Sequence, residues 1–160
     1  MITWREFAAE RPDLAEAGRG LLYQFGVGLA FLATTRADGA PRVHPMCPLV
    51  TEGGLYAFIV PSPKRNDLHR DGRYAMHSFP ADDNEDAFSL AGRAWRVANP
   101  ALAATLARRY AEERKMGEPP SALANWEPFE FSIGSCLLTR TTKHGDPDPR
   151  HTTWHAPDST

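Results

Sequence analysis

The segment from Phe25 to Phe79 alternates short apolar stretches with tight-turn sequences, and this pattern restricts the fold more than any other feature of the chain. Large apolar side chains recur at every second position from Phe25 to Phe31, as in a β-strand. Asp38-Gly39 and Glu52-Gly53-Gly54 are typical of tight turns between antiparallel strands. The segment therefore predicts a small antiparallel barrel rather than a βαβ sheet.

The rest of the chain extends this pattern. Thr3 and Glu6 form a capping-box sequence, and a second helical segment follows Pro12. Asn99 and Pro100 are typical of a helix start, and that helix is expected to end near Met116. Strands are expected over residues 25–33, 42–50, 55–60, 73–79, 88–97 and 129–140, with a helix over 64–70 and a short last strand over 151–155. Pro45 and Pro48 predict an irregular second strand, because proline has no amide hydrogen to donate.

These elements predict a single domain over residues 1–160, mainly β with flanking helices and six or seven antiparallel strands. Residues 1–20 are expected to form an N-terminal helical cap, and residues 143–160 a C-terminal loop and short strand. The net charge of −2 argues against a nucleic-acid partner, which usually requires a basic surface. No run of about 18 apolar residues is present, so no membrane partner is expected.

Cysteine and histidine usage adds two further expectations. Cys47 and Cys136 are the two cysteines and have no CxxC spacing, and the first residues lack the apolar centre of a signal peptide, so a cytoplasmic location is expected. Six histidines occur without HExxH or a Cys/His cluster at ligand spacing, so no metal site is predicted.

The junction after the third strand contains the clearest candidate chemistry. Ser62, Lys64 and Arg65 lie where a strand passes into a helix. Amide groups at a helix start attract anions, and two cations with a hydroxyl strengthen that attraction. Arg42 joins them if the second strand neighbours the third, since a guanidinium binds phosphate through two hydrogen bonds. Alternatively, Lys64 and Arg65 are solvated surface charges.

Three stretches carry a family resemblance: FLATTRADGAPRVHPM, LYAFIVPSPKRNDLHRDGRYAMH and LAGRAWRV. In this order they resemble the pyridoxamine 5'-phosphate oxidase-like flavin-binding split-barrel superfamily, over roughly residues 22–97. The resemblance implies a split β-barrel that binds FMN in a groove at a homodimer interface. It also implies that the phosphate is held by Arg42, Ser62 and Lys64, with Arg65 as an alternative to Lys64.

The same resemblance implies contacts to the flavin ring. The backbone near Phe58 and Ile59 is expected to face the ring, and His44 shares the strand face of Arg42. Trp154 is the candidate for closing the groove from a partner subunit, although a core tryptophan is the common alternative. Tyr110 and Arg114 have a spacing that resembles a substrate-phosphate pair.

Two departures limit what the resemblance implies. Superfamily members that oxidise pyridoxamine phosphate carry a lysine at the place occupied here near Cys47, and an Arg-x-His motif that is absent near Cys136. We therefore expect the residues that bind the cofactor to be present and those that bind a vitamin B6 substrate to be absent.

The sequence is compatible with three functions. The first is an FMN-dependent oxidoreductase that acts on a small organic molecule, with no catalytic side chain assigned. The second is a reductase that uses the deazaflavin coenzyme. The third is a non-catalytic flavin- or haem-binding module.

Overall fold

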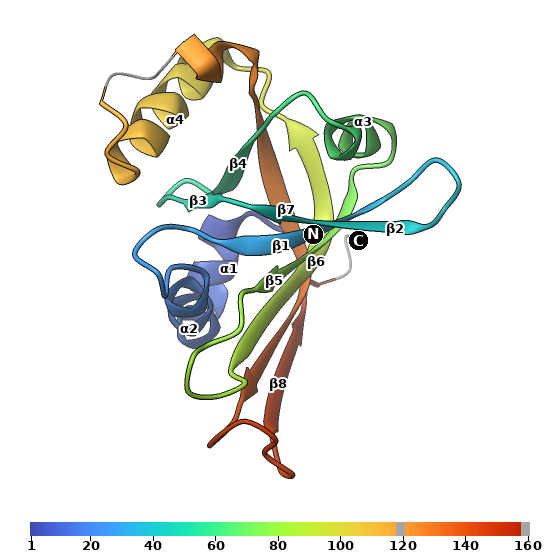
Figure 1. Ribbon diagram of the computed structural model, residues 1–160, viewed down its shortest axis with the longest axis vertical. Coiled ribbons are helices and arrows are strands. Elements are labelled where there is room, and N and C mark those ends of the chain that lie inside the picture. The colour runs from blue at the N-terminus through green and yellow to red at the C-terminus, as the bar shows by residue number, and fades with distance from the viewer. Residues whose placement is uncertain (118–120, 158–160) are drawn as a thin grey trace.

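The predicted turn at Asp38-Gly39 joins two paired strands in the structure, a computed structural model that describes residues 1–117 and 121–157 (Figure 1). The strands are β1 (Ala30–Thr35), β2 (Pro41–Met46), β3 (Pro48–Val50), β4 (Leu55–Ile59), β5 (Arg73–Ser78), β6 (Ala87–Arg96), β7 (Glu127–Arg140) and β8 (Arg150–His155). The helices are α1 (Trp4–Glu10), α2 (Pro12–Leu22), α3 (Pro63–Arg70) and α4 (Pro100–Glu113), with a short 3₁₀ helix η1 (Ser121–Asn125).

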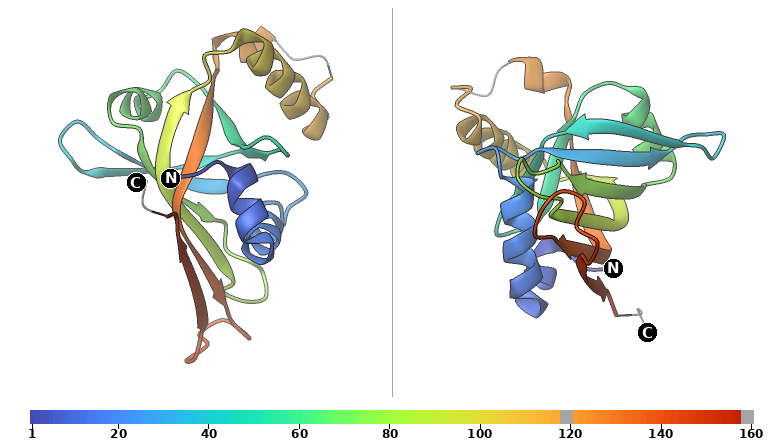
Figure 2. Two further views of the ribbon diagram at one scale, coloured as in Figure 1. Left: turned by 180° about the vertical axis from the view of Figure 1, so that it is seen from behind. Right: turned by 60° about the horizontal axis from the view of Figure 1, so that its bottom comes forward.

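The strands form one antiparallel sheet that curls into a split barrel. Its order is β2-β1-β5-β6-β7-β4-β3, and β8 adds to β7. Because β2 and β3 are consecutive in the chain, the two ends of this order meet at Cys47 and close the barrel. The views in Figure 2 show the curled sheet with helices around it. The predicted fold class, mainly β with flanking helices, is confirmed.

The predicted second strand is two strands in the structure. β2 pairs with β1 up to Met46, whereas β3 pairs with β4 from Pro48, so the chain changes partner at Cys47. Pro48 cannot donate a ladder hydrogen bond, which suits such a switch. The prediction of irregularity was right, and the single span 42–50 was wrong.

The first strand also differs from its prediction. It begins at Ala30 rather than Phe25, because the chain from Gln24 to Leu29 turns. Gly26 has φ of +84°, a conformation that favours glycine. A Cβ on Gly28 would lie 2.0 Å from the carbonyl oxygen of Pro48, so this segment passes directly against β3. The apolar alternation before Ala30 therefore belongs to a close-packed turn.

Helices α1 and α2 pack against the barrel core. The Thr3 hydroxyl accepts a hydrogen bond from the Glu6 amide, and the Glu6 carboxylate accepts one from the Thr3 amide, as the capping box predicts. Trp4 and Phe7 are buried and pack against the barrel core, with Trp4 edge-on to Phe88. The two helices therefore seal one side of the main core.

Helix α4 builds a second, smaller core. Its apolar residues Leu106 and Tyr110 pack with Leu49, Tyr56 and Phe58 from β3 and β4. The Asn99 side chain accepts hydrogen bonds from two amides of the first turn, as predicted for this helix start. None of the helices in the described ranges is long and apolar enough to cross a membrane.

Candidate functional site

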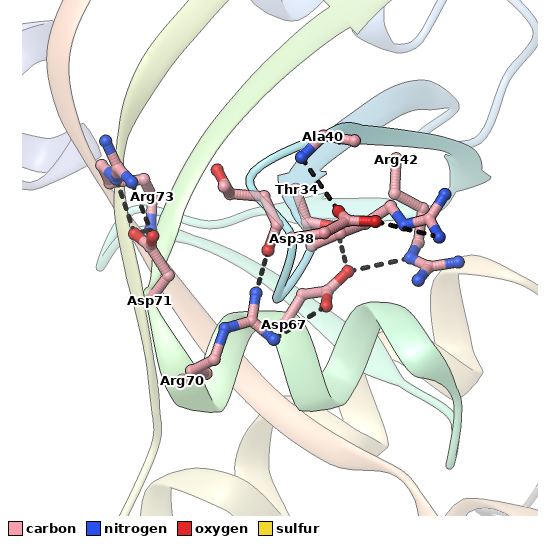
Figure 3. Close-up of polar contacts among 10 residues, drawn as sticks. Thr34, Asp38, Ala40, Arg42, Asp67, Arg70, Asp71 and Arg73 are labelled. Atoms are coloured by element: carbon pink, nitrogen blue, oxygen red, sulfur yellow. Dashed lines mark hydrogen bonds and ion pairs between the residues drawn. The ribbon is translucent and has the colours of Figure 1, made fainter.

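One buried carboxylate, that of Asp67, joins helix α3 to strands β1 and β2. It is 4% exposed and accepts hydrogen bonds from Thr34 Oγ1 on β1 (3.0 Å), Arg42 Nε on β2 (2.8 Å) and Arg70 Nη1 (3.1 Å). Figure 3 shows these three side chains directed at Asp67. Since Thr34 and Arg42 are direct partners in the β1–β2 ladder, one carboxylate fixes both strands to the helix.

The Asp67 carboxyl remains ionised in this environment. Burial alone would raise its pKa, but hydrogen bonds from Arg42, Thr34 and Arg70 outweigh burial and lower the pKa below its ordinary value. The predicted phosphate ligand Arg42 therefore already has one anionic partner within its own chain.

A cavity of about 330 Å³ lies beside this carboxylate. It is lined by residues of the β1–β2 turn, β2 and the start of α3: Arg36, Ala37, Asp38, Arg42, Pro63, Asn66 and Asp67. Arg42 reaches Asp67 with Nε, and its two Nη groups make no hydrogen bond to any residue in the described ranges. The cavity therefore combines two arginines and two carboxylates with the start of a helix; Arg36 pairs with Asp38 at 3.5 Å, whereas Arg42 still has its Nη donors for an anion.

Lys64 lies on the same side of α3 as Asp67, one turn earlier. Its ammonium donates a 3.4 Å hydrogen bond to the carbonyl oxygen of Pro45, on β2. Burial lowers the pKa of the Lys64 ammonium. The structure thus brings the predicted residues Arg42 and Lys64 to the same contact between α3 and β2.

Ser62 occupies the N-cap position of α3 but does not cap it. Its hydroxyl donates to the carbonyl oxygen of Val60 at 2.8 Å, and no side chain caps the helix. Pro63 has no amide hydrogen, and the amides of Arg65 and Asn66 donate to the Ser62 carbonyl oxygen, so of this turn the Lys64 amide is the one left for an anion among the described contacts.

Arg65 is directed away from the predicted phosphate site. Its Nη1 donates to the carbonyl oxygen of Asn125 at 3.0 Å and lies 4.0 Å from a Glu127 oxygen. Arg65 therefore ties α3 to η1 and β7, and the structure does not bring it together with Arg42.

His44 lies on β2, whereas Phe58 and Ile59 lie at the end of β4. His44 is half-buried, pairs with Leu32 and shares the strand face of Arg42. The side chains of Phe58 and Ile59 are buried, and their backbones pair with β7 on one edge. On the other edge β3 stops at the level of Ala57, so both residues have a backbone edge without a strand partner. This edge is available for the predicted contact to a flavin ring.

Trp154 lies on β8, outside the contact between α3 and β2. Its side chain is 7% exposed, its ring centroid is 5.0 Å from that of Phe7, and its Nε1 donates to Glu10 at 2.9 Å. The indole thus joins β8 to α1, and the structure does not bring it together with Arg42 or Lys64. This placement fits the alternative in which Trp154 is a core tryptophan.

Tyr110 and Arg114 contact each other on α4. The Arg114 guanidinium lies 3.9 Å from the Tyr110 ring centroid and also bonds Glu113 and the carbonyl oxygen of Gly28. These contacts attach α4 to the segment before β1. Arg114 therefore has a structural role within the chain.

Sequence reasoning missed Asp67, Thr34 and Arg36. Asp67 lies in the stretch KRNDLHR, where a carboxylate among cations is typical of a solvated helix face. Its position three residues after Lys64 placed both on one helix face, and that spacing was the available signal.

Comparison with known proteins gives likeness of structure only. No family model and no curated protein sequence matches the chain. A haem-binding protein from Mycobacterium smegmatis superimposes with a TM-score of 0.63 at 15% identity, over 87% of this chain and 57% of that one. A protein related to general stress protein 26, of the pyridoxinephosphate oxidase family, from Clostridium acetobutylicum gives 0.61 at 13% identity, over 94% and 95%. An F420 reductase gives 0.56 at 19% identity, over 68% and 87%.

The chain has the split-barrel fold of the pyridoxamine 5'-phosphate oxidase-like proteins. Split-barrel neighbours include proteins described as haem-binding, as an F420 reductase and as oxidase-family members. The chain spans little more than half the length of the mycobacterial haem-binding protein. At these identities the fold is common to all of them, whereas the bound group differs, so the cofactor must be argued from residues of this chain.

Proposed function

We propose that this protein binds FMN and acts with it as an oxidoreductase on a small organic molecule. The observation that carries the proposal is the convergence of Arg42 and Lys64 on the uncapped start of α3. A phosphate monoester is a compact dianion, and guanidinium, ammonium and free helix amides are the groups that hold such an anion in proteins.

The residues of the chain fit the two ends of FMN. The cavity beside Arg42 and Arg36 receives the phosphate, with the free Nη groups of Arg42 as donors. The backbone edge at Phe58 and Ile59, which β3 does not pair with, suits the polar edge of the flavin ring. A bound flavin supplies the hydride transfer, and the chain holds and orients it.

The deazaflavin coenzyme is the closest alternative, because it too presents phosphate to these cations. A haem is the second alternative, and likeness to the haem-binding protein supports it. His44 is half-buried on the Arg42 face and makes no hydrogen bond within the described ranges, so it is the axial ligand that this alternative would use.

We also propose that the working unit is a homodimer. The faces of β5 to β8 form a shallow depression of about 230 Å³, lined largely by small side chains such as Ala75, Ala91 and Ser135 and also by Leu137 and by Thr153 and His155 of β8. Side chains this small allow a second sheet to approach closely. This face would therefore contact a second copy.

The direct experiment is titration of the purified apoprotein with FMN, the deazaflavin coenzyme and haemin, each followed by its visible spectrum. The proposal predicts tight binding of FMN with a perturbed flavin band. Tight binding of the deazaflavin coenzyme without FMN would select the first alternative. A sharp haem band that is lost in His44→Ala would select the second and overturn the proposal.

A further inference from the structure

A second cavity lies between α4 and the turn that joins β3 to β4. Its volume is about 380 Å³, within the range of small-molecule sites, and it shares no lining residue with the cavity beside Asp67. It lies at the edge of the small core that α4 forms with β3 and β4. A ligand in this cavity would therefore contact none of the residues that line the cavity beside Asp67.

Tyr56 lines this cavity and carries a phenol hydroxyl. Tyr56 is 4% exposed, and its hydroxyl lies against Gly54, where a Cβ would be 2.7 Å away. This hydroxyl makes no hydrogen bond to any residue in the described ranges, and among them no fully buried side-chain nitrogen or oxygen lacks a partner. The hydroxyl is therefore the accessible end of an otherwise buried ring, and it faces the cavity that Tyr56 lines.

Helix α4 supplies an apolar wall and a cation. Leu102, Leu106 and Arg109 recur at helical spacing and line the cavity. Arg109 is exposed and makes no ion pair or hydrogen bond within residues 1–117 and 121–157. The neighbouring Arg108 donates to Thr105, so of these two adjacent arginines Arg109 is the one that lines the cavity with its donors unused.

The other polar groups of the cavity restrict the kind of ligand that can bind there. The hydroxyls of Thr51 and Thr105 already donate to the carbonyl oxygens of Gly54 and Ala101. The Glu52 carboxylate is exposed at the rim and disfavours a ligand with more than one negative charge. A fitting ligand has one anionic group, hydrogen-bond acceptors and an apolar body.

We propose that this cavity binds a small monocarboxylate with an apolar body, whose carboxylate pairs with Arg109 and accepts a hydrogen bond from the Tyr56 hydroxyl. The apolar body lies against Leu102 and Leu106. Burial raises the pKa of the Tyr56 phenol, so the hydroxyl stays protonated as a donor at neutral pH.

The test is an NMR titration of the ¹⁵N-labelled protein with phenylacetate as the probe. Phenylacetate is expected to shift the amide signals of Gly53, Leu106 and Arg109. Arg109→Gln should weaken binding about tenfold or more, because it removes a charge-assisted contact. Tyr56→Phe should weaken binding by a smaller factor without loss of folding, because the hydroxyl has no partner in the described part of the chain.

Two controls make the result specific. Arg108→Gln removes the adjacent arginine of α4 and should leave phenylacetate binding unchanged. The neutral phenylacetamide should bind much more weakly than phenylacetate. Absence of shifts at millimolar phenylacetate, equal binding by Arg109→Gln, or equal binding of the amide would each overturn the proposal.

Discussion

Asp67 on α3 and Arg42 on β2 are joined by a 2.8 Å hydrogen bond between a buried carboxylate and a guanidinium that is still a quarter exposed. One Asp67 oxygen therefore holds Nε, while the Nη groups of the same arginine remain available on the cavity side. The pair links the stability of the barrel to the orientation of the proposed phosphate ligand.

The first prediction concerns stability. Asp67→Asn should lower the free energy of unfolding by about 3 kcal/mol, because breaking a buried pair leaves Arg42 without its counter-charge. The measurement is equilibrium urea unfolding. Asp13→Asn removes an exposed carboxylate that pairs with Arg11, and as a control it should cost much less, because solvent screens an exposed ion pair. Equal costs for the two variants would contradict a special role for Asp67.

The second prediction concerns the free energy of unfolding at acidic pH. The pKa of Asp67 is lower in the folded protein than in the unfolded chain, so the unfolded chain takes up the proton first as the pH falls. The stabilisation from Asp67 is thus present at neutral pH and is lost as the pH falls below about 4. Unfolding free energies measured across this range should fall less steeply for Asp67→Asn than for the native chain. Parallel curves would show that Asp67 does not contribute to the acid response.

Much of the fold could be predicted from local sequence. The capping box at Thr3, the helix start at Asn99 and the turn at Asp38-Gly39 depend on residues a few positions apart, and the structure confirms all three. The start of the first strand could not be predicted in this way. Residues 25–29 have a strand-like alternation, but Gly28 lies against Pro48 and the segment turns there.

The candidate site was predictable in part for a related reason. Arg42 and Lys64 could be paired because each follows a recognisable strand or junction. Asp67 could not, because its partners Thr34 and Arg42 are 33 and 25 residues away and local charge alone is typical of a solvated face. The opposite directions of Lys64 and Arg65 likewise depend on β2 and η1, which only the folded chain brings to α3.

A third prediction concerns the proposed homodimer. Ala75 is exposed on the outer face of β5, so Ala75→Arg should leave the barrel folded while it separates the two copies. Light scattering should give a dimer for the native chain and a monomer for the variant. Ala104→Arg, at an exposed position of α4, is the control and should remain dimeric. A native monomer would contradict the proposed dimer.

A fourth prediction separates the two interpretations of Trp154. The indole packs on Phe7 and bonds Glu10, so Trp154→Phe should lower the unfolding free energy by about 1 kcal/mol for the lost hydrogen bond. The Trp154→Phe variant should bind FMN with the same affinity as the native protein. A large loss of FMN affinity without loss of stability would instead support a cofactor contact from a partner subunit.

The central claim is that cations at the start of α3 hold a phosphate, and the affinity for FMN relative to riboflavin tests it most directly. The two flavins differ only in the phosphate, so the native protein should prefer FMN by about tenfold or more, as one charge-assisted contact provides. The double variant Arg42→Lys/Lys64→Ala keeps a cation beside Asp67 but removes the guanidinium donors, and it should lose most of this preference. Arg108→Ala should retain it. Equal affinity of the native protein for FMN and riboflavin, or an unchanged preference in the double variant, would contradict the account.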